Sequence, residues 1–109
     1  MLIVSEDNSI FLTRGDNAEI EITLTKDGQT YDYSNDDVKF GMKRSAFDTD
    51  CVLEKEIVDG KLVLTEDDTK DLEFGDYLYD VELRTEVEGE EQVYTPIAAA
   101  KFSIGYNVL

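Results

Sequence analysis

The side chains of this sequence that could do chemistry are almost all carboxylates. Aspartate and glutamate together number 26, histidine is absent, and Cys51 is the one cysteine. A chain without histidine has no Ser-His-Asp or Cys-His catalytic set and no histidine metal site. Two carboxylates can hydrolyse a glycosidic bond, but among 26 acids some pair always lies close together. The sequence therefore predicts a protein that is not an enzyme, with no catalytic residue and no cofactor.

Three acidic loops raise the question of a calcium site. Their acidic or amide side chains are Asn35, Asp36 and Asp37, then Asp48 and Asp50, then Glu66, Asp67 and Asp68. Calcium takes roughly six to eight oxygen ligands around one point, and none of these loops has the D-x-[DN]-x-[DN]-G spacing that would supply them locally. We therefore predict solvated loops and no metal residue, and leave open a site whose ligands come from several loops.

The formal net charge of −16 narrows the classes of partner. A field of this sign repels nucleic acid phosphates and anionic membrane surfaces, so we expect neither nucleic acid nor membrane as a partner. A basic protein, divalent cations or solubility alone could each make use of the charge. The sequence shows no long apolar segment and no basic, apolar leader, which predicts neither a signal peptide nor a membrane span.

The length of the chain and its single cysteine limit the number of domains and of disulfide bonds. A sequence of 109 residues predicts a single domain over residues 1–109. One cysteine forms no intrachain disulfide, so the fold does not depend on an oxidising compartment. Cys51 alternates with Leu53 in an apolar run, which predicts that Cys51 is a buried small hydrophobe.

Apolar and polar residues alternate in nearly every apolar segment. The clearest runs are residues 18–26, 38–43, 77–85 and 98–104. A period of two is typical of strands with one face on a core and the other in water. With further strands at 9–13, 52–58, 61–65 and 92–95, the sequence predicts an all-β fold. We expect an immunoglobulin-like Greek-key β-sandwich of about seven to eight antiparallel strands.

Glycine-containing turns predict two hairpins. Asp59-Gly60 is expected to join strands 52–58 and 61–65, because both central positions of such a turn tolerate positive φ. Gly89 interrupts an acidic link and is expected to turn the chain between the two strands that flank it.

Sheet edges are predicted from the one proline. Pro96 has no N–H to donate, which favours an edge or a bulge, so residues 9–13 and 93–104 are the candidate edges. The apolar residues 106–109 could pack on a neighbouring molecule or fold back on their own domain.

Leu72, Gly75 and Tyr77 have the spacing L-x-x-G-x-Y of a tyrosine corner in a Greek-key sandwich. In such a corner the glycine adopts a conformation that a Cβ would resist, and the phenol bonds to upstream backbone. We predict these three residues as a structural corner. One short helical turn near residues 66–72 is expected before it, with Thr65 as the cap and Asp68 reaching back to it.

Two further motifs have a functional and a structural interpretation. Tyr31 and Tyr33 lie in the polar segment DGQTYDYSND and are predicted as a possible contact surface, although rim tyrosines of a sandwich often bind nothing. Arg14-Gly15-Asp16 is the tripeptide of integrin ligands. Because nothing indicates a secreted adhesin, we interpret it as a glycine turn that leads into strand 18–26.

Taken in order, these segments resemble a known family. The sequence reads TRGD, IEITLTKDG, VKFGMKRS, CVLEKEIVDGKLVLT, EDDTKDLEFGDYLYDVEL and TPIAAAKFSI. This order resembles the immunoglobulin-like sandwich domains in tail, baseplate and fibre proteins of phages and prophages of Gram-positive bacteria, from about Ile10 to Ile104. The most specific elements are Arg14-Gly15-Asp16, Asp59-Gly60-Lys61, and Asp68-Thr69 leading to Gly75-x-Tyr77-x-Tyr79-Asp80.

The resemblance implies a virion structural part that acts in assembly or host-surface attachment. Its expected partners are other virion proteins or further copies in a homo-oligomer, with a host-surface component possible. Its expected location is the virion, assembled in the bacterial cytoplasm. Two alternatives stay open: a carbohydrate- or cell-surface-binding sandwich module, and an acidic mimic of DNA that inhibits a basic protein.

Overall fold

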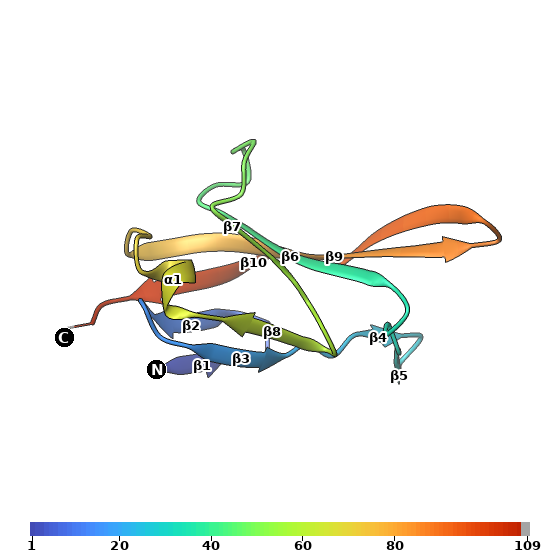
Figure 1. The fold of residues 1–109 in the computed structure, drawn as a ribbon, viewed down its shortest axis with the longest axis horizontal. Coiled ribbons are helices and arrows are strands. Elements are labelled where there is room, and N and C mark those ends of the chain that lie inside the picture. Colours follow the sequence, from blue (N-terminus) through green and yellow to red (C-terminus); the bar gives the residue numbers. More distant parts are fainter. Residues whose placement is uncertain (108–109) are drawn as a thin grey trace.

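This computed structural model describes residues 1–107 of the chain. They contain ten strands and one short helix, joined by loops (Figure 1). In chain order they are β1 (Leu2–Val4), β2 (Ile10–Thr13), β3 (Ala18–Glu21), β4 (Thr25–Lys26), β5 (Gln29–Thr30), β6 (Asp37–Lys43), β7 (Leu53–Glu56), β8 (Lys61–Leu64), α1 (Glu66–Thr69), β9 (Gly75–Val87) and β10 (Glu90–Gly105). The fold is all-β and sandwich-like, which confirms the predicted fold class. The structure has more strands than the seven to eight that were predicted. The predicted strand 18–26 is interrupted, and β1 and β5 are too short to show alternation.

The larger sheet is curled and has six strands in the order β1-β2-β10-β9-β6-β7, while β3 pairs with β8 and β4 with β5. Figure 1 shows β3 and β8 on the opposite side of the core from β9 and β6. Every described pair is antiparallel except β2 and β10, which run parallel with Ile10 opposite Phe102. The prediction of antiparallel strands alone was wrong for this pair, because β2 and β10 meet across the sheet and no hairpin joins them.

The core is built by the inward-facing residues of both layers. A cluster of three rings lies at its centre, formed by Phe40, Tyr79 and Phe102 with centroid distances of 5.3, 6.0 and 6.2 Å. All three side chains are buried. The Tyr79 phenol donates a hydrogen bond to the carbonyl of Asn8, and burial raises the pKa of Tyr79 to about 12. The Tyr79 ring therefore joins the apolar cluster while its one polar atom has a partner.

The turn at Asp59-Gly60 forms, but the hairpin predicted around it was wrong. Asp59 has φ 54° and Gly60 φ 75°, as a tight turn of this kind requires. The strands on either side share only the bridge between Val58 and Lys61. Beyond it β7 pairs with β6 and β8 pairs with β3. The strands diverge because β7 joins the larger sheet, whereas β8 buries Leu62 and Leu64 from the opposite layer of the sandwich.

The second predicted hairpin forms and is longer than expected. Glu88 and Gly89, with φ 53° and 80°, turn β9 into β10. The two strands pair along their length, from Gly75 opposite Ile104 to Val87 opposite Glu90. β6 pairs with β9 only over Leu78–Arg84. The rest of the hairpin, residues 85–92, extends beyond the sandwich (Figure 1), and we call this segment the arm. The arm contributes to the elongated shape, 51 × 28 × 23 Å, and to a radius of gyration of 14.5 Å, against roughly 13 Å for a compact chain of this length.

The structure corrects the predicted edges. The outer strands of the six-stranded sheet are β1 and β7, and β2 lies inside because β1 covers it. β10 pairs with β2 over Phe102–Gly105, so only residues 90–101 of β10 have a partner strand on one side alone among the described residues. Pro96 lies at a shift of register between β9 and β10, so the bulge interpretation of this proline holds. A second shift includes Ala99, which has φ 51° and donates its N–H to Asp80 at 2.6 Å.

α1 lies within the predicted segment 66–72, and its first turn is held by hydrogen bonds and an ion pair to residues before it in the sequence. The Thr65 N–H donates to the Asp68 carboxylate at 2.8 Å, as predicted. The Asn17 side-chain oxygen accepts the N–H of Glu66 at 2.9 Å. Lys55 of β7 also reaches Asp68, with Nζ 3.1 Å from Oδ2. Asp68 therefore connects the helical turn to the edge of the larger sheet.

Asp68→Asn is expected to change how the free energy of unfolding depends on pH. Burial alone would raise the pKa of the Asp68 carboxyl, but the Thr65 N–H and the Lys55 ammonium outweigh it and hold the pKa below the ordinary 3.8. A lowered pKa contributes stability that is present above pH 3.8 and is lost as the pH falls through the folded-state value. The variant should be less stable by about 1 to 2 kcal/mol at pH 7, and it should lose less stability than the wild type below pH 3.8.

Urea denaturation across this acidic range measures the effect. Asp67→Asn is the control, because Asp67 lies on the same turn and is 80% exposed, and its one ion pair among residues 1–107 is with Lys70 at 2.8 Å. The control should change the free energy of unfolding by no more than about 0.5 kcal/mol. Equal pH profiles for the two variants would show that Asp68 has no special role.

Candidate functional site

The predicted corner is a structural element. Tyr77 is buried, and its phenol donates a 2.7 Å hydrogen bond to the carbonyl of Glu73. Gly75 has φ +123°, a conformation that side chains with a Cβ rarely adopt. Leu72 is partly buried against the core. The Arg44 guanidinium lies 4.6 Å from the centroid of the Tyr77 ring and covers the corner from outside.

The side chains of the Arg14-Gly15-Asp16 tripeptide bind their own domain. The Arg14 guanidinium lies 4.0 Å from the centroid of the Phe74 ring, and Asp16 contacts the amino group of Met1. The Gly15 N–H donates to the hydroxyl of buried Thr69 at 2.8 Å. These contacts support the structural interpretation of the tripeptide, in which Gly15 fixes the loop against α1.

Tyr31 and Tyr33, the predicted contact residues, line the same hollow between the two layers. The Tyr31 phenol donates to Asp36 at 2.7 Å, and the Tyr33 phenol donates to the carbonyl of Ile22. The hollow has a volume of about 750 Å³ and we call it the tyrosine hollow. It is lined by residues 22–24, 30–34, 36–39 and 56–60. The structure therefore brings the two tyrosines together with residues from β6 and from the β7–β8 connection.

Acidic groups dominate the rim of the tyrosine hollow. Its ionisable carboxylates are Asp32, Asp36, Asp37, Glu56 and Asp59, and its one cation among the described residues is Lys39. The Ser34 N–H holds the pKa of Asp32 below its ordinary value, and the hydrogen bond to Asp36 raises the pKa of Tyr31. At neutral pH the hollow thus carries a negative potential, with protonated phenols inside it.

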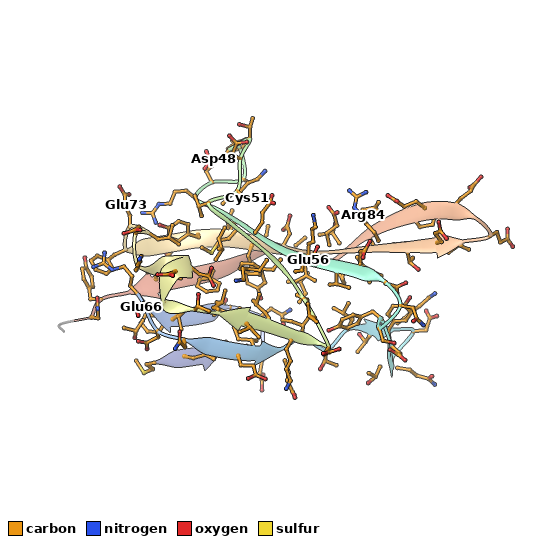
Figure 2. All side chains as sticks on the ribbon, viewed as in Figure 1. Asp48, Cys51, Glu56, Glu66, Glu73 and Arg84 are labelled. Carbon is orange, nitrogen blue, oxygen red and sulfur yellow. The ribbon has the colours of Figure 1, made fainter. Side chains whose placement is uncertain are left out.

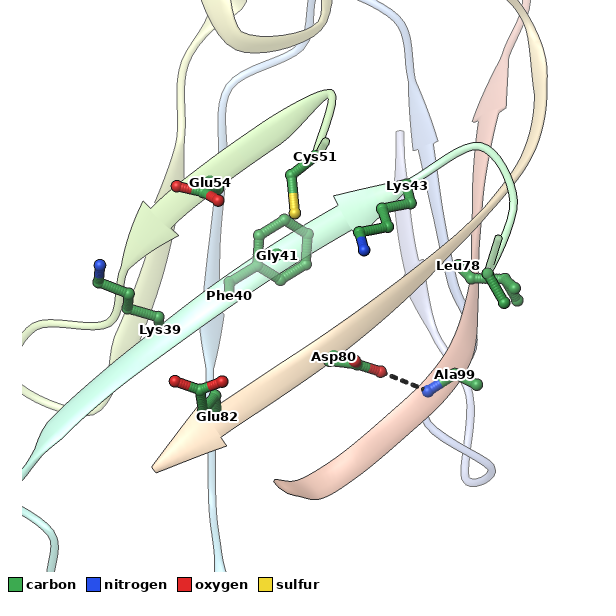
Figure 3. Close-up of a pocket in the computed structure, with 11 residues that line it drawn as sticks. Lys39, Phe40, Gly41, Lys43, Cys51, Glu54, Leu78, Asp80, Glu82 and Ala99 are labelled. Atoms are coloured by element: carbon green, nitrogen blue, oxygen red, sulfur yellow. Dashed lines mark hydrogen bonds between the residues drawn. The ribbon is translucent and has the colours of Figure 1, made fainter. Parts of the chain in front are cut away.

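A second hollow lies on the outer face of the larger sheet (Figure 3). It has a volume of about 380 Å³ and is centred on Gly41 of β6, where a side chain is missing. Lys39, Lys43, Glu54, Asp80 and Glu82 surround it, so its charges are mixed. These opposite signs give no preference for a charged ligand.

Cys51 faces this second hollow, which corrects the prediction that it is buried. The thiol is partly exposed and points toward Gly41 (Figure 3), with Sγ 3.3 Å from where a Cβ on Gly41 would stand. The side chain lies at the surface because the 44–52 loop leaves the sheet before β7 begins. Burial and the neighbouring Glu54 raise the pKa of the thiol, which favours the unreactive protonated form.

The three acidic loops stay separate, and Figure 2 shows Asp48 of the second loop well away from Glu66 of the third. Within residues 1–107 no group of three or more acidic or cysteine side chains is placed to hold a metal ion. Asp36 is engaged by Tyr31, Asp48 accepts the N–H of Ser45 at 3.1 Å, and Asp68 accepts that of Thr65. These carboxylates thus have local roles in fixing turns. In the same part of the chain, no helix is long and apolar enough to cross a membrane.

Large exposed apolar side chains include some on the arm, one on a loop and one in the predicted apolar C-terminus. Val87, Val93 and Tyr94 lie on or beside the arm, each about half exposed. Phe47, at the tip of the β6–β7 loop, is 96% exposed. Tyr106 is exposed but stacks on Phe74, with ring centroids 4.1 Å apart. The first part of the predicted apolar C-terminus therefore folds back on its own domain, and residues 108–109 lie outside the described part.

Comparisons with known proteins do not assign the chain to a family. No family model, no curated protein and no solved structure matches the chain. The arguments for function therefore rest on the surfaces described above and on the order of segments along the sequence.

Proposed function

We propose that this chain is a non-enzymatic structural and interaction module of a phage or prophage particle. In this proposal it is a tail, baseplate or fibre component that acts in assembly or host-surface attachment. The sandwich-like fold and the order of its sequence segments support the proposal. Other virion proteins or further copies of the chain are its proposed partners.

The observation that carries an interaction role is the arm with the adjoining part of β10. Residues 90–101 of β10 have only β9 beside them among the described strands. Val87 and Tyr94 place apolar side chains on one face of the hairpin, away from the core, and Val93 places one on the other face. Exposed apolar side chains on a projecting element are typical of protein contact sites. A partner that covers this surface would gain apolar burial without disturbing the sandwich.

Val93→Asp is expected to reduce the amount of the protein in purified particles. Particles from an induced culture of the source organism should contain several copies of the wild-type chain, counted by mass spectrometry. A carboxylate at Val93 would be buried against the partner, so its incorporation should fall by about tenfold. Val93 is 48% exposed in the isolated chain, so the substitution should leave the fold intact.

Val63→Asp is the matched control for this experiment. Val63 of β8 is 50% exposed and lies far from the arm along the chain. The control should enter particles like the wild type. A wild-type chain that stays in the lysate and is absent from intact particles would contradict the proposal.

A surface-binding module is the second candidate, and the tyrosine hollow favours it. Aromatic rings with nearby carboxylates can bind sugars or cell-surface groups. Binding of the purified chain to host cell walls, lost in Tyr31→Ala, together with its absence from particles would favour this candidate over the first.

A further inference from the structure

The free edge of β10 is regular at its start, over residues 90–94, and irregular beyond them. Between Tyr94 and Ala100 the register with β9 shifts twice, and Pro96 in this stretch has no N–H to donate. Bulges and prolines keep a strand edge from pairing with another chain. Residues 90–94, which we call the arm edge, have neither, and β9 is their only partner strand within residues 1–107. The chain thus leaves the arm edge open to a further strand.

The turn of the arm decides which backbone groups face this edge. Glu88 and Gly89 both have positive φ, 53° and 80°, as in a two-residue hairpin of type I′. The residues that flank such a turn exchange backbone hydrogen bonds, and bonded and non-bonded pairs then alternate along the ladder. Every second residue of β10 from Glu90 is therefore bonded to β9, whereas the N–H and C=O groups of Glu91 and Val93 point away from it. These four groups have no backbone partner within the described chain.

Exposed apolar side chains flank the arm edge on both faces of the hairpin. Val93 is 48% exposed on the face that also carries Arg84, its partner in the register. Tyr94 is 51% exposed on the other face. Because side chains alternate along a strand, a strand laid beside the arm edge would cover Val93 with one of its faces and Tyr94 with the other. Backbone pairing and apolar burial would thus occur together.

The charge of the arm selects the partner. Residues 85–92 contain no cation and four glutamates, which are Glu86, Glu88, Glu90 and Glu91. Only Glu91 has an ion pair within residues 1–107, with Arg84 at 2.7 Å. The other three leave a negative potential beside the arm edge, which attracts lysine and arginine. A second copy of this chain is disfavoured there, because pairing would bring two such sets of glutamates near one another.

We propose that the arm edge binds an extended segment of a protein partner by strand addition. The segment pairs with the backbone groups of Glu91 and Val93, places apolar side chains beside Val93 and Tyr94, and directs lysine or arginine toward the glutamates of the arm. The inference rests on the proposed function in taking a protein partner at the arm. It adds how that partner is held and which side chains it carries.

A short fluorescent peptide of alternating valine and lysine residues tests the inference, with its binding to the full chain followed by fluorescence anisotropy. Val93→Pro removes an N–H that faces the edge and puts a ring where the added strand would lie, while the bonds to β9 stay. It should weaken binding by about tenfold. Val93→Thr is the matched control, because it keeps the N–H and the branched shape, and it should change the affinity by less than about threefold. Equal weakening by both variants would mean that the side chain alone is recognised, which would overturn strand addition.

A pair of double variants tests the choice of a basic segment. Glu86→Gln/Glu90→Gln should weaken peptide binding by about threefold, because two charges beside the arm edge are removed. Asp50→Asn/Glu73→Gln removes the same two charges from exposed positions outside the arm and should change the affinity by less than about twofold. If both double variants weaken binding equally, the peptide responds only to the overall field and the inference is wrong.

Amide hydrogen exchange of the wild type gives a measurement that depends on no variant. With saturating peptide the amides of Glu91 and Val93 should exchange at least about tenfold more slowly, because they gain partners, while the amides of β8 should not change. A wild type that binds no peptide, or that binds it without this slowing, would contradict strand addition. A wild-type dimer that Val93→Pro abolishes would assign the arm edge to a second copy and would equally overturn the inference.

These measurements use the isolated chain, so their outcome is separate from detection in particles. A chain that enters particles but binds no peptide would leave the proposed function standing without this inference. A chain that binds the peptide through the arm edge and is absent from particles would do the reverse.

Discussion

Phe40→Ala is expected to lower the free energy of unfolding by about 3 to 5 kcal/mol. Phe40 is 0% exposed, and its ring packs against both other rings of the core cluster, with centroids 5.3 Å from Tyr79 and 6.0 Å from Phe102. Removing it leaves a cavity that strands paired on both sides of β6 cannot close. Because domains of this size are stable by only about 5 to 15 kcal/mol, the variant should lose about a fifth of its stability or more.

The matched control is the same substitution at an exposed position. Phe47→Ala removes a ring that is 96% exposed at the tip of the β6–β7 loop, so the change should stay within about 0.5 kcal/mol. Urea denaturation followed by far-ultraviolet circular dichroism measures both variants. Similar losses for Phe40 and Phe47 would contradict the assignment of the ring cluster as the core.

Gly75→Ala is expected to cost about 2 to 4 kcal/mol through two separate effects. The first is backbone strain, because φ at Gly75 is +123°. The second is steric: a Cβ would stand 2.8 Å from Nη2 of Arg44, so this side chain would have to move. Arg44 would then lose its contact with the Tyr77 ring and its 3.2 Å hydrogen bond to the carbonyl of Phe74. The corner at the start of β9 should therefore become the weakest part of the sandwich.

Gly89→Ala separates the two effects. Gly89 also has positive φ, +80°, but a Cβ there meets no atom within 4 Å. Its cost should be about 1 kcal/mol, from strain alone. Thermal unfolding of the two variants at the same pH gives the comparison. If Gly75→Ala proves no more costly than Gly89→Ala, Arg44 does not matter for the corner.

Alternation along single strands was enough to predict the fold class, but not the pairing between strands. The run 38–43 is nearly the whole of β6, and the glycine at position 89 does turn β9 into β10. Asp59-Gly60 forms the same kind of turn, yet its strands separate into different layers. A turn motif fixes local backbone geometry, whereas the layer that each strand joins depends on burial against distant residues. The strand β1 has three apolar residues in a row and so shows no period.

The candidate site was predicted only in part, for the same reason. Tyr31 and Tyr33 stand out as aromatic residues in a polar segment. The carboxylates that complete the rim are ordinary members of a chain with 26 acids, and Glu56 is distant from the tyrosines in sequence. Their grouping arises only when β6 and the end of β7 meet beside the 31–36 segment. The arm was missed because residues 85–92 bury little and so leave no alternating signal.

The parallel pairing of β2 with β10 has a consequence for synthesis. It joins Ile10, near the start of the sequence, to Phe102, near its end. On the ribosome β2 has no partner on that side until β10 has emerged, so the sheet can close only after β10 has been synthesised. Contacts between residues so far apart in sequence also slow folding, because the loop between them must be ordered first. Until β10 emerges, the many acids that precede it in the sequence keep incomplete chains apart by mutual repulsion.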